Sequence, residues 1–591
     1  MQILSDAESV RCPSALRGFY SPCALPRLFQ RAGKSNTNSQ NPNMLDGTAM
    51  MHLERRVPWA IAGCIFLLAL AIRLMGISWG LPEKLDIHPD ENMYVISNVS
   101  KILQQLTDVY QHKAPFSLNA LDPGFLNYPA FIMYLCGTLY VVATKIGLIS
   151  PALANIYIVG RCISAFFGAA TSLVGMSIVR KMGGQTISCV LTGLCLALCP
   201  QNIWDSHVAA TDVLMTFWIM LTLFAAIKII EKGRKRDYII AGLFLGIAIG
   251  SKYTAAIAFI SIVTATFFAK KSFAQSLNRL FLSFISTICA FFLVAPFSLL
   301  RFQDLIQAML YEHKHTTGFH YGFSLPASGW QYHKYIYQLF AAWPFSLGLA
   351  LYIFCMIGLI VSAFHINKKN FTLLIFFIVY FLITGNWMLT PLRYYLPLLS
   401  VMIIIASFLA GKYIENTTSY LPRIIISLSI LVIIGYTAIF SWQTTLRFKN
   451  DTRIEAAKWL NEYCTKNNIN EFITIGAINY SATANDGNFK KISYVSEIDF
   501  FRNYRNKQID MLQITSIMYN RAYRHNNPFT KGMYEEIRHK NYILIKRFAS
   551  NFINKNIYTK LDPMFEGYFI SPTLEFYRPI GSTHGAAVSL H

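Results

Sequence analysis

Long apolar segments recur along this chain, and they constrain its fold more than any other feature. A helix needs about 20 mostly apolar residues to cross the hydrocarbon core of a bilayer. The candidate membrane-spanning segments are residues 59–80, 157–179, 185–203, 208–230, 238–250, 253–269, 278–300, 336–364, 371–389, 392–411 and 422–442. The sequence therefore predicts a polytopic α-helical membrane protein with about 11 transmembrane helices.

The composition agrees with this class and helps to decide which kind of partner the chain binds. Charged residues make up 14% of the 591 residues and hydrophobic residues 54%, whereas a soluble domain has about a quarter charged residues. The formal net charge of +22 is typical of nucleic-acid binding. Lys and Arg, however, cluster in short loops between apolar segments, as the positive-inside rule requires. We therefore expect a lipid bilayer, with anionic lipid or a lipid phosphate as the counter-charge, and no nucleic acid.

The basic loops also predict a topology. Basic residues precede the first segment and then fall at every second connection, which places the N-terminus in the cytoplasm and the C-terminus outside. This pattern holds only if residues 81–156 lie wholly outside. The apolar run 128–150 is long enough to span, so we expect it to lie along or dip into the outer interface as an interfacial helix; a tight hairpin is the alternative.

Three regions follow from this layout. Residues 1–58 lack a compact signal-peptide pattern and are predicted to be a disordered cytoplasmic tail; the alternative is an over-called start, with Met50 or Met51 as the true start. Residues 59–442 form the membrane domain, with a first external loop at 81–156 and a second at 301–335. Residues 443–591 mix a helix-like start ("DTRIEAAKWLNEYC") with strand-like pieces ("EFITIGAI", "NYILIKRF"), which predicts a small extracytoplasmic α/β domain.

Acidic residues mark a candidate site on the outer face. The stretches 123–204 and 313–414 contain no Asp or Glu, whereas Asp90 and Glu91 stand side by side in the first external loop. Asp212 lies a turn inside an apolar helix, where a charge is costly and is usually functional or paired. The simpler interpretation of Asp90 and Glu91 is an N-terminal helix cap, a position that acids favour.

A carboxylate at a membrane interface can accept the proton of an incoming hydroxyl group. Lys252 in "GSKYTA" and Arg393 in "TPLRYYLP" begin segments on the same predicted face and can hold a leaving anion. Each can instead extend its charge to the interface without any further role. Together with Asp90 and Asp212, these cations predict a cleft that binds a phosphate and acts on a hydroxyl group.

Histidines add two weaker signals. His88 and His207 lie near the key acids in the sequence, where they can tune those acids or help to hold a cation. His313 and His315 have the His-x-His spacing of a metal site, with His320 nearby; the alternative is a polar interfacial loop with aromatic anchors. No zinc-type cysteine spacing occurs. We therefore assign no metal ligands and no certain cofactor, and leave a divalent cation open.

Several motifs resemble the GT-C superfamily of membrane glycosyltransferases, in the glycosyltransferase family 39 or protein O-mannosyltransferase-like branch that includes the lipid A aminoarabinose transferases. They occur in the order of that family, over roughly residues 59–460. The motifs are "HPDE", "NYPAFIMYL", "GRCISAFFGAATSLVGMSIVRKMGG", "LALCPQNIWDSHVAATDVLMTFW", "GLFLGIAIGSKYTA", "LRYYLPLL" and "DTRIEAAKWL".

The resemblance implies a seven-span module with interfacial helices, and a sugar donor carried on a polyprenyl phosphate. It implies that the Asp of the first-loop acid pair, here Asp90, is the catalytic base, and that Asp212 contributes to the same site. Glu91, the partner of Asp90, completes the catalytic candidates. The substrate-binding candidates are Lys252 and Tyr253 of "SKY", Arg393 and Tyr394 of "LRYY", and the two histidines, His88 and His207.

The functional prediction is an inverting glycosyltransferase that moves a sugar from a polyprenyl-phosphate donor to a hydroxyl group of a lipid, glycan or protein. The resemblance implies a multi-pass protein of a bacterial inner (plasma) membrane, working on the outer face. The alternative is a transporter or flippase of lipid-linked sugars, against which the one-sided acids and the lack of an inverted repeat argue. A non-catalytic scaffold that binds partners through residues 443–591 is the third interpretation.

Overall fold

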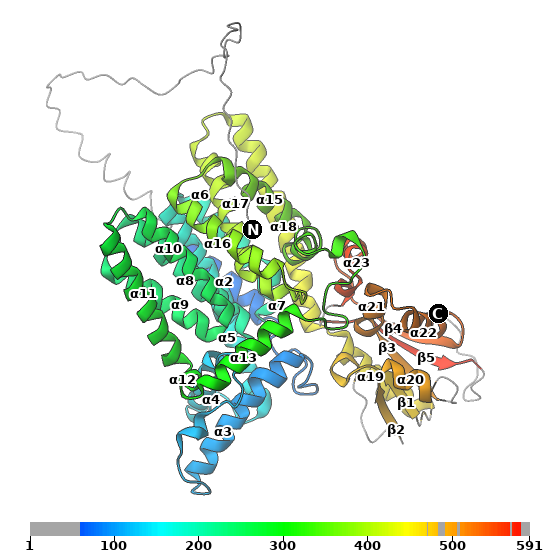
Figure 1. Ribbon diagram of the computed structural model, residues 1–591. Helices are drawn as coiled ribbons and strands as arrows, with labels where there is room; N and C mark the ends of the chain where they lie inside the picture. Colours follow the sequence, from blue (N-terminus) through cyan, green and yellow to red (C-terminus); the bar gives the residue numbers. More distant parts are fainter. Residues whose placement is uncertain are drawn as a thin grey trace, which may run out of the picture. The chain divides into compact units, whose positions relative to one another are not determined.

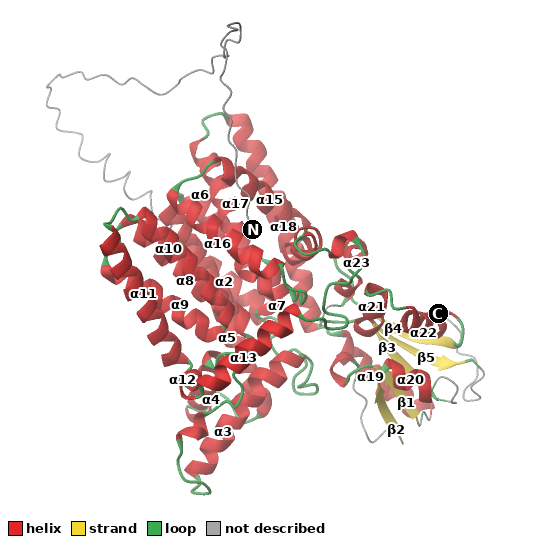
Figure 2. Ribbon diagram, in the orientation of Figure 1, coloured by secondary structure: helices red, strands yellow, loops and turns green. Residues whose placement is uncertain are grey.

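The computed structural model describes residues 59–467, 469, 471–482, 491–504, 509–567 and 570–580. The predicted tail at residues 1–58 lies outside these ranges. In the described part, a long series of helices comes first, and all five strands follow after residue 470 (Figures 1 and 2). The mostly helical fold with a small C-terminal sheet agrees with the predicted fold class.

The helices of the first region range from short turns to helices of 30 residues. In order they are α2 Trp59–Leu74, α3 Ser97–Tyr110, α4 Phe131–Lys145, α5 Leu153–Met182, α6 Thr186–Ala197, α7 Pro200–Asp205, α8 Thr211–Glu231, α9 Lys235–Ser251, α10 Phe259–Phe268, α11 Phe273–Val294, α12 Phe297–Leu300, α13 Phe302–Thr317, α14 Trp343–Leu347, α15 Leu349–Phe364, α16 Lys368–Gly385, α17 Leu396–Asn416 and α18 Tyr420–Lys449. The π-helical turns are η1 Glu91–Ile96 and η5 Gln338–Ala342, and the 3-10 turns are η2 Leu118–Leu121, η3 Tyr253–Ala258, η4 Trp330–Tyr332 and η6 Leu392–Tyr395.

Among the described residues, six helical runs are long and apolar enough to cross a membrane: Leu153–Met182, Thr211–Glu231, Phe273–Val294, Lys368–Gly385, Leu392–Asn416 and Tyr420–Asn467. Shorter apolar helices are Trp59–Leu74, Phe131–Lys145, Thr186–Ala197, Tyr253–Phe268 and Leu349–Phe364. The chain is thus a multi-pass membrane protein by length and composition, and the count of 11 transmembrane helices stays a prediction.

Helix α8 connects two different clusters of charged side chains. Asp212, in its first turn, accepts a hydrogen bond from Lys252 at 2.7 Å. Glu231, its last residue, pairs with Lys369 at 2.7 Å and Lys181 at 3.2 Å. A helix of 21 residues is about 30 Å long, the thickness of a bilayer core. The basic connections therefore gather at one end of the helices and the predicted site gathers at the other.

The long segment between α2 and α5 leaves and re-enters the helical region at one place. Arg161 of α5 donates hydrogen bonds to the carbonyl oxygens of Ile77 at 2.9 Å and Trp79 at 2.7 Å, just beyond the end of α2. Helix α4 lies inside this segment, and its Cys136 thiol contacts the carbonyl oxygen of Ile156 at 3.6 Å. Arg161 therefore fixes the start of the first loop, which carries Asp90 and Glu91.

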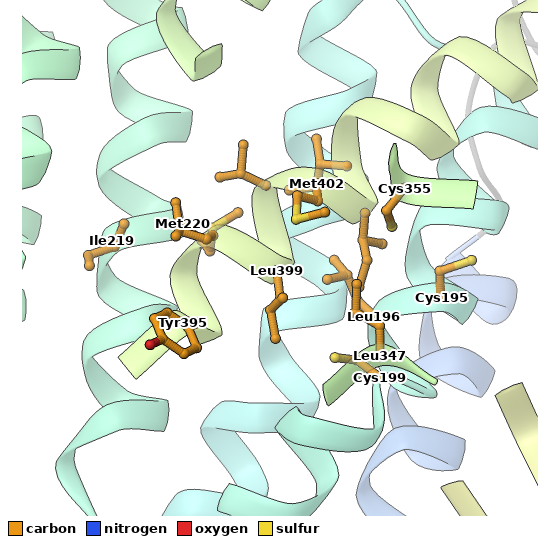
Figure 3. Close-up of a cluster of buried hydrophobic side chains, with 14 of the residues drawn as sticks. Cys195, Leu196, Cys199, Ile219, Met220, Leu347, Cys355, Tyr395, Leu399 and Met402 are labelled. Carbon is orange, nitrogen blue, oxygen red and sulfur yellow. The ribbon is translucent and has the colours of Figure 1, made fainter. Parts of the chain in front are cut away.

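The core of the helical region consists of apolar side chains from helices far apart in the sequence. Figure 3 shows Cys195 of α6, Met220 of α8, Cys355 of α15, and Leu399 and Met402 of α17 in one cluster. All five side chains are buried. Helices α8 and α17, whose first turns carry or adjoin the charged residues of the site, are therefore held rigidly by their apolar lengths.

Small residues allow the helices to approach closely. A Cβ atom on Gly411 of α17 would lie 2.4 Å from the Cα of Ser188 on α6. A Cβ atom on Gly246 of α9 would lie 2.3 Å from the carbonyl oxygen of Thr287 on α11. Close backbone approach at small residues is typical of helix pairs in membranes, where van der Waals packing drives association.

The C-terminal region folds around a five-stranded mixed sheet with strand order β2-β1-β3-β5-β4. Strand β1 pairs in parallel with β2 and β3, whereas β5 pairs antiparallel with β3 and β4. The strands are β1 Glu471–Ile475, β2 Lys491–Val495, β3 Met511–Thr515, β4 Tyr542–Phe548 and β5 Leu574–Pro579. The helices are α19 Thr452–Asn467, α20 Glu497–Asn503, α21 Ser516–Arg524, α22 Pro528–His539 and α23 Lys555–Leu561, with 3-10 turns η7 Ile478–Tyr480 and η9 Pro563–Glu566.

Candidate active site

Four of the predicted site residues meet in an alternating chain of charges. Arg393 Nη2 lies 2.5 Å from Asp90 Oδ2, and Arg393 Nε lies 3.4 Å from Asp212 Oδ2. Asp212 Oδ1 in turn lies 2.7 Å from Lys252 Nζ. The residues come from positions 90, 212, 252 and 393 of the sequence, so the fold brings together acids and bases that only a tertiary structure can join.

Each of these residues stands where a helix begins or ends. Asp90 immediately precedes the π-helical turn η1, and π-turns are frequent at functional sites. Asp212 is in the first turn of α8, where the positive end of the helix dipole favours an acid. Lys252 is extended between α9 and η3, and Arg393 lies in η6 ahead of α17. The charges therefore sit at helix ends rather than inside the apolar lengths.

The two acids differ in access. The side chain of Asp90 is 31% exposed and that of Asp212 is 3% exposed. Burial opposes ionisation of Asp90, but the charges of Arg393, His88 and Lys252 outweigh it and lower the pKa of this carboxyl group. Asp90 is therefore an ionised carboxylate that incoming molecules can reach, whereas Asp212 is enclosed between two cations.

A cavity of about 690 Å³ lies beside Asp90. Its lining residues come mainly from the first loop, α13 and the segment before α17: Pro89, Asp90, Tyr94, Gly124, Phe125, Leu126, Asn127, Tyr128, Arg301, Asp304, Gln307, Ala308, Tyr311, Glu312, His315, His320, Phe323, Leu389, Pro391, Arg393, Tyr394 and Tyr480. A volume of this size fits a small-molecule site. We call it the Asp90 cavity.

A second cavity of about 520 Å³ lies beside Lys252, and we call it the Lys252 cavity. Its apolar lining includes Met309, Leu382 and Ile383, whose side chains are also exposed on the surface of the helices. The two cavities share part of their walls, formed by Asn127, Tyr128, Glu312 and Tyr394. A chamber whose wall carries charged side chains thus adjoins a chamber that opens on apolar surface.

Helix α13 separates the two cavities. Its residues Gln307, Tyr311 and His315 face the Asp90 cavity, one turn apart, whereas Met309 and His313 face the Lys252 cavity. The helix is tied to the first loop at both ends. Arg301, just before it, pairs with Asp122 at 2.9 Å, and Glu312 accepts a hydrogen bond from Asn127 at 3.0 Å.

Glu91 does not line either cavity, in contrast to the sequence prediction that pairs it with Asp90. Its side chain is fully buried and accepts hydrogen bonds from Arg161 Nε at 2.8 Å and Nη2 at 2.7 Å. It accepts a third from the backbone N–H of Ala209 at 2.9 Å. The reason is geometric: successive residues of a helical turn point about 100° apart, so neighbours in the sequence face different surroundings.

His207 is also enclosed. Its ring nitrogens each lie 2.8 Å from a carbonyl oxygen, of Ile203 and of Met75, and its ring stacks on Phe448 at 4.1 Å. His88 stays close to the charges, because it lines a small pocket together with Asp205, Asp212 and Arg393. Of the two histidines, the structure therefore brings only His88 to the site.

The two predicted tyrosines lie in the cavity walls. Tyr394 lines both cavities, and Lys252 Nζ lies 4.1 Å from the centre of its ring. Tyr253 lines the Lys252 cavity and donates a hydrogen bond to the carbonyl oxygen of Leu126 at 2.5 Å. Both residues can therefore contact a molecule bound beside Lys252.

The His-x-His pair is not a shared ligand set. Residues two apart on a helix point about 200° apart, and α13 accordingly directs His313 and His315 to different cavities. The rings of His315 and His320 are near each other, with centroids 4.3 Å apart. Among the described residues, no group of three or more His, Cys, Asp or Glu side chains is arranged to hold a metal ion.

The sequence prediction left out several residues of the site. Glu312 and Asn127 bridge the cavities, and Asn127 belongs to the "NYP" motif without any chemical signal of its own. Asp205 lies behind the site, with both oxygens 3.1 Å from the amide nitrogen of Gln201. Burial, together with the charge of Asp212, raises the pKa of Asp205 to about 7. Its place two residues before His207 and seven before Asp212 in the sequence was the available signal.

Residues 152–299 match the family model described as dolichyl-phosphate-mannose-protein mannosyltransferase. No curated protein matches the chain significantly. Among solved structures, the archaeal oligosaccharyltransferase AglB from Archaeoglobus fulgidus has 13% identity and a TM-score of 0.45, over 83% of this chain and 74% of that one. ArnT from Cupriavidus metallidurans, bound to undecaprenyl phosphate, has 12% identity and a TM-score of 0.44, over 92% and 100%.

The Pmt1–Pmt2 protein O-mannosyltransferase of S. cerevisiae has 16% identity and a TM-score of 0.30, over 52% of this chain and 40% of that one. These structural similarities are weak. The family match is more informative about the candidate site than these structural similarities, because the matched range includes Arg161, Asp212 and Lys252. It confirms, for residues 152–299, the resemblance to the protein O-mannosyltransferase branch that the sequence motifs predicted.

Proposed function

We propose that this protein is an inverting glycosyltransferase that moves a sugar from a polyprenyl-phosphate donor to an acceptor hydroxyl group. One observation carries the proposal. An accessible carboxylate, Asp90, and two cations, Arg393 and Lys252, lie together where two cavities share a wall. A base for the acceptor and positive charge for the leaving phosphate are the two requirements of this reaction.

The Lys252 cavity suits the donor. Its apolar residues Ile257, Met309 and Leu382 can contact the prenyl chain, while Lys252 holds the phosphate. The exposed apolar side chains at its edge would let the lipid enter from the bilayer. The sugar then lies at the shared wall, between Tyr394 and Glu312, and the acceptor approaches through the Asp90 cavity.

The reaction is a single displacement. Asp90 takes the proton of the acceptor hydroxyl group, and the acceptor oxygen forms a bond to the anomeric carbon of the sugar. The bond between that carbon and the phosphate oxygen breaks, and its electron pair leaves with polyprenyl phosphate. Arg393 and Lys252 stabilise this anion. Because one displacement occurs, the anomeric configuration inverts.

Arg393 links donor binding to the strength of the base. In the structure it holds Asp90, and its charge helps to lower the pKa of that carboxyl group. A donor phosphate competes for the same guanidinium, since Arg binds carboxylates and phosphates in the same way. Sharing Arg393 with the phosphate makes Asp90 a stronger base when the donor is present. Asp212 positions Arg393 and Lys252, and Glu91 positions the first loop through Arg161.

The topology belongs to the same proposal. We propose that Asp90 lies on the outer face of a plasma membrane, that residues 59–442 form the transferase domain and that residues 443–591 are extracytoplasmic. The gathering of Lys181, Lys369 and Glu231 at the opposite end of α8 supports this orientation under the positive-inside rule. The family match lends no support to the alternative of a transporter or flippase.

Release of free polyprenyl phosphate tests the function. Membranes that contain the protein are given a panel of polyprenyl-phosphate sugars, with Asp90→Asn as the matched variant. Release from at least one donor by the wild type, and loss of that release in the variant at equal protein level, is the expected result. Full release by Asp90→Asn would overturn the role of Asp90.

A further inference from the structure

Four side chains form the wall that the two cavities share: Asn127, Tyr128, Glu312 and Tyr394. Lys252 Nζ lies 5.8 Å from the centre of the Tyr128 ring and 4.1 Å from that of the Tyr394 ring. A phosphate held by Lys252 therefore lies beside this wall. Under the proposed function, the sugar is attached to that phosphate through a single oxygen atom, so the shared wall contacts the sugar.

Glu312 differs from the other acids in the cavity walls. Among the described residues that line the two cavities, the acids are Asp90, Asp304 and Glu312. Asp90 pairs with Arg393 at 2.5 Å. Asp304 pairs with Arg301 at 2.7 Å. Glu312 makes no ion pair with any cation in the described part of the chain. Its side chain is only partly buried, so this carboxylate is open to a ligand.

A single side-chain hydrogen bond occupies the carboxylate of Glu312. Its Oε1 atom accepts from Nδ2 of Asn127 at 3.0 Å. An ionised carboxylate only accepts hydrogen bonds, and each of its oxygens can accept more than one. Oε2 of Glu312 and Oδ1 of Asn127 are therefore left as acceptors in the shared wall. Acceptors of this kind bind hydroxyl or amino groups and repel other carboxylates.

Both residues of this pair are held in place by the fold. One helical turn after Glu312, the carbonyl oxygen of Thr316 accepts a hydrogen bond from the backbone N–H of Leu389 at 3.1 Å. On the other side, the carbonyl oxygen of the residue before Asn127 accepts a hydrogen bond from Tyr253 at 2.5 Å. A fixed pair of acceptors discriminates between ligands, because it cannot move away from a group that it repels.

We propose that Glu312 and Asn127 form the sugar subsite of the donor, where they bind a hydroxyl or amino group of the sugar and reject a sugar with a negative charge. The inference rests on the proposed function, because it takes the donor phosphate to lie at Lys252. The rings of Tyr128 and Tyr394 lie in the same wall and provide apolar faces for the C–H groups of a sugar ring. The donor is then a polyprenyl phosphate of a neutral or amino sugar, and not of a uronic acid.

The test is equilibrium binding of short prenyl phosphate sugars by the full-length protein in nanodiscs, without any acceptor. Prenyl phosphate glucose and prenyl phosphate glucuronate form a matched pair, because the two sugars differ only in the charged group of the glucuronate. The wild type is expected to bind the glucosyl compound at least about tenfold more tightly, since like charges in an enclosed site repel each other. Glu312→Gln should reduce this ratio to below about threefold, mainly through tighter binding of the glucuronate.

The ratio of the two affinities cancels any change in phosphate binding, because both compounds carry the same prenyl phosphate. Glu535→Gln removes an exposed acid of α22 and should keep the ratio of the wild type. A 6-amino analogue of the glucosyl compound distinguishes the two groups that Glu312 can bind. Tighter binding of the analogue than of the glucosyl compound identifies an amino sugar, and equal or weaker binding identifies a hydroxyl group.

Equal binding of the glucosyl and glucuronyl compounds by the wild type would overturn the subsite. A ratio that is unchanged in Glu312→Gln would also overturn it, and would leave Glu312 as a link between α13 and the first loop. In both cases, binding of prenyl phosphate without a sugar would leave the proposed function standing. If prenyl phosphate itself does not bind, the proposed donor site falls together with the subsite.

Discussion

Two acid–arginine pairs stand next to each other in this molecule, and they are built in opposite ways. Asp90 and Arg393 are joined by one bond of 2.5 Å, with side chains 31% and 16% exposed, on the wall of a large cavity. Glu91 and Arg161 are joined by two bonds, with side chains fully buried. Backbone groups also bond to the enclosed pair: the carbonyl oxygens of Ile77 and Trp79 accept from Arg161, and the N–H of Ala209 donates to Glu91.

The comparison shows how to separate a structural charge from a functional one. The Glu91–Arg161 pair is fully buried, is bonded on several sides and lines neither cavity, so a substrate in either cavity does not reach it. The Asp90–Arg393 pair leaves carboxylate and guanidinium surface facing the Asp90 cavity, and each partner can exchange the other for a ligand. Under the proposed function, Glu91 therefore holds the site in place, while the adjacent residue Asp90 carries out its chemistry.

The largest contrast is expected from removing each acid in turn. Asp90→Asn should lower the rate of polyprenyl phosphate release by about 10²–10⁴-fold, because a general base contributes about that much. Glu91→Gln should change the rate per folded molecule by less than about threefold, since Glu91 does not line either cavity. The two rates are measured in membranes matched for folded protein. Equal losses in both variants would break the distinction between the pairs.

Removing the cation of the donor cavity should have the next largest effect. Lys252→Met should weaken donor binding by about 10–100-fold, since it deletes a charge-assisted contact to phosphate in a buried place. Asp212 would also lose its 2.7 Å partner. The concentration of donor that gives half-maximal release measures this. Lys228→Met, on the same α8 helix but near its other end, is the control and should leave donor binding unchanged.

Loss of the enclosed Glu91–Arg161 pair should lower the stability of the protein. Glu91→Gln leaves the buried charge of Arg161 without its partner, and breaking a buried ion pair costs about 3–5 kcal/mol. Thermal unfolding in detergent, followed by the loss of native fluorescence, should show a lower midpoint than the wild type. Asp90→Asn, at a partly exposed pair, should shift the midpoint by much less. A larger shift for Asp90→Asn than for Glu91→Gln would reverse the assignment.

Removing the charge of Arg393 should shift the pH dependence of the transferase activity. Asp90 works as a base only when ionised, and its pKa lies below the ordinary value, so wild-type activity is lost only as the pH falls through that lowered pKa. Arg393→Gln removes the main cation, so the pKa should rise and the acid limb should move up by about one pH unit or more. Rates of release from about pH 4 to pH 8 measure this. Arg301→Gln, in the same cavity but paired with Asp122 and Asp304, should not move the limb.

The sequence pointed to much of the candidate site because charged side chains are energetically costly in a membrane. Asp212, Lys252 and Arg393 stood out as charges at the ends of apolar segments, where a charge needs a partner or a function. The structure joins them to Asp90 within hydrogen-bond or ion-pair distance. The residues alone could not separate Asp90 from Glu91, and only the family resemblance singled out Asp90, because which side of a helical turn faces a cavity depends on contacts from position 161 and position 209.

Other parts of the site and of the fold could not be predicted, because they depend on long-range contacts that leave no local pattern in the sequence. Glu312 meets Asn127 across 185 positions of the chain, and nothing near either residue predicts that contact. In the C-terminal region, the predicted pieces at "EFITIGAI" and "NYILIKRF" correspond to β1 and β4. Strand β3 was missed: all five of its residues are buried, Gln513 among them, so it has no alternation of polar and apolar residues to detect.

The measurement that tests the central claim most directly is the release of free polyprenyl phosphate from a panel of polyprenyl-phosphate sugars by wild-type membranes, run beside a lipid-translocation assay on the same donors. The account predicts release from at least one donor, dependent on Asp90, without a matching rise in translocation. Translocation of the intact donor, with no release of polyprenyl phosphate from any of them, would contradict the account and identify the cavities as a transport path.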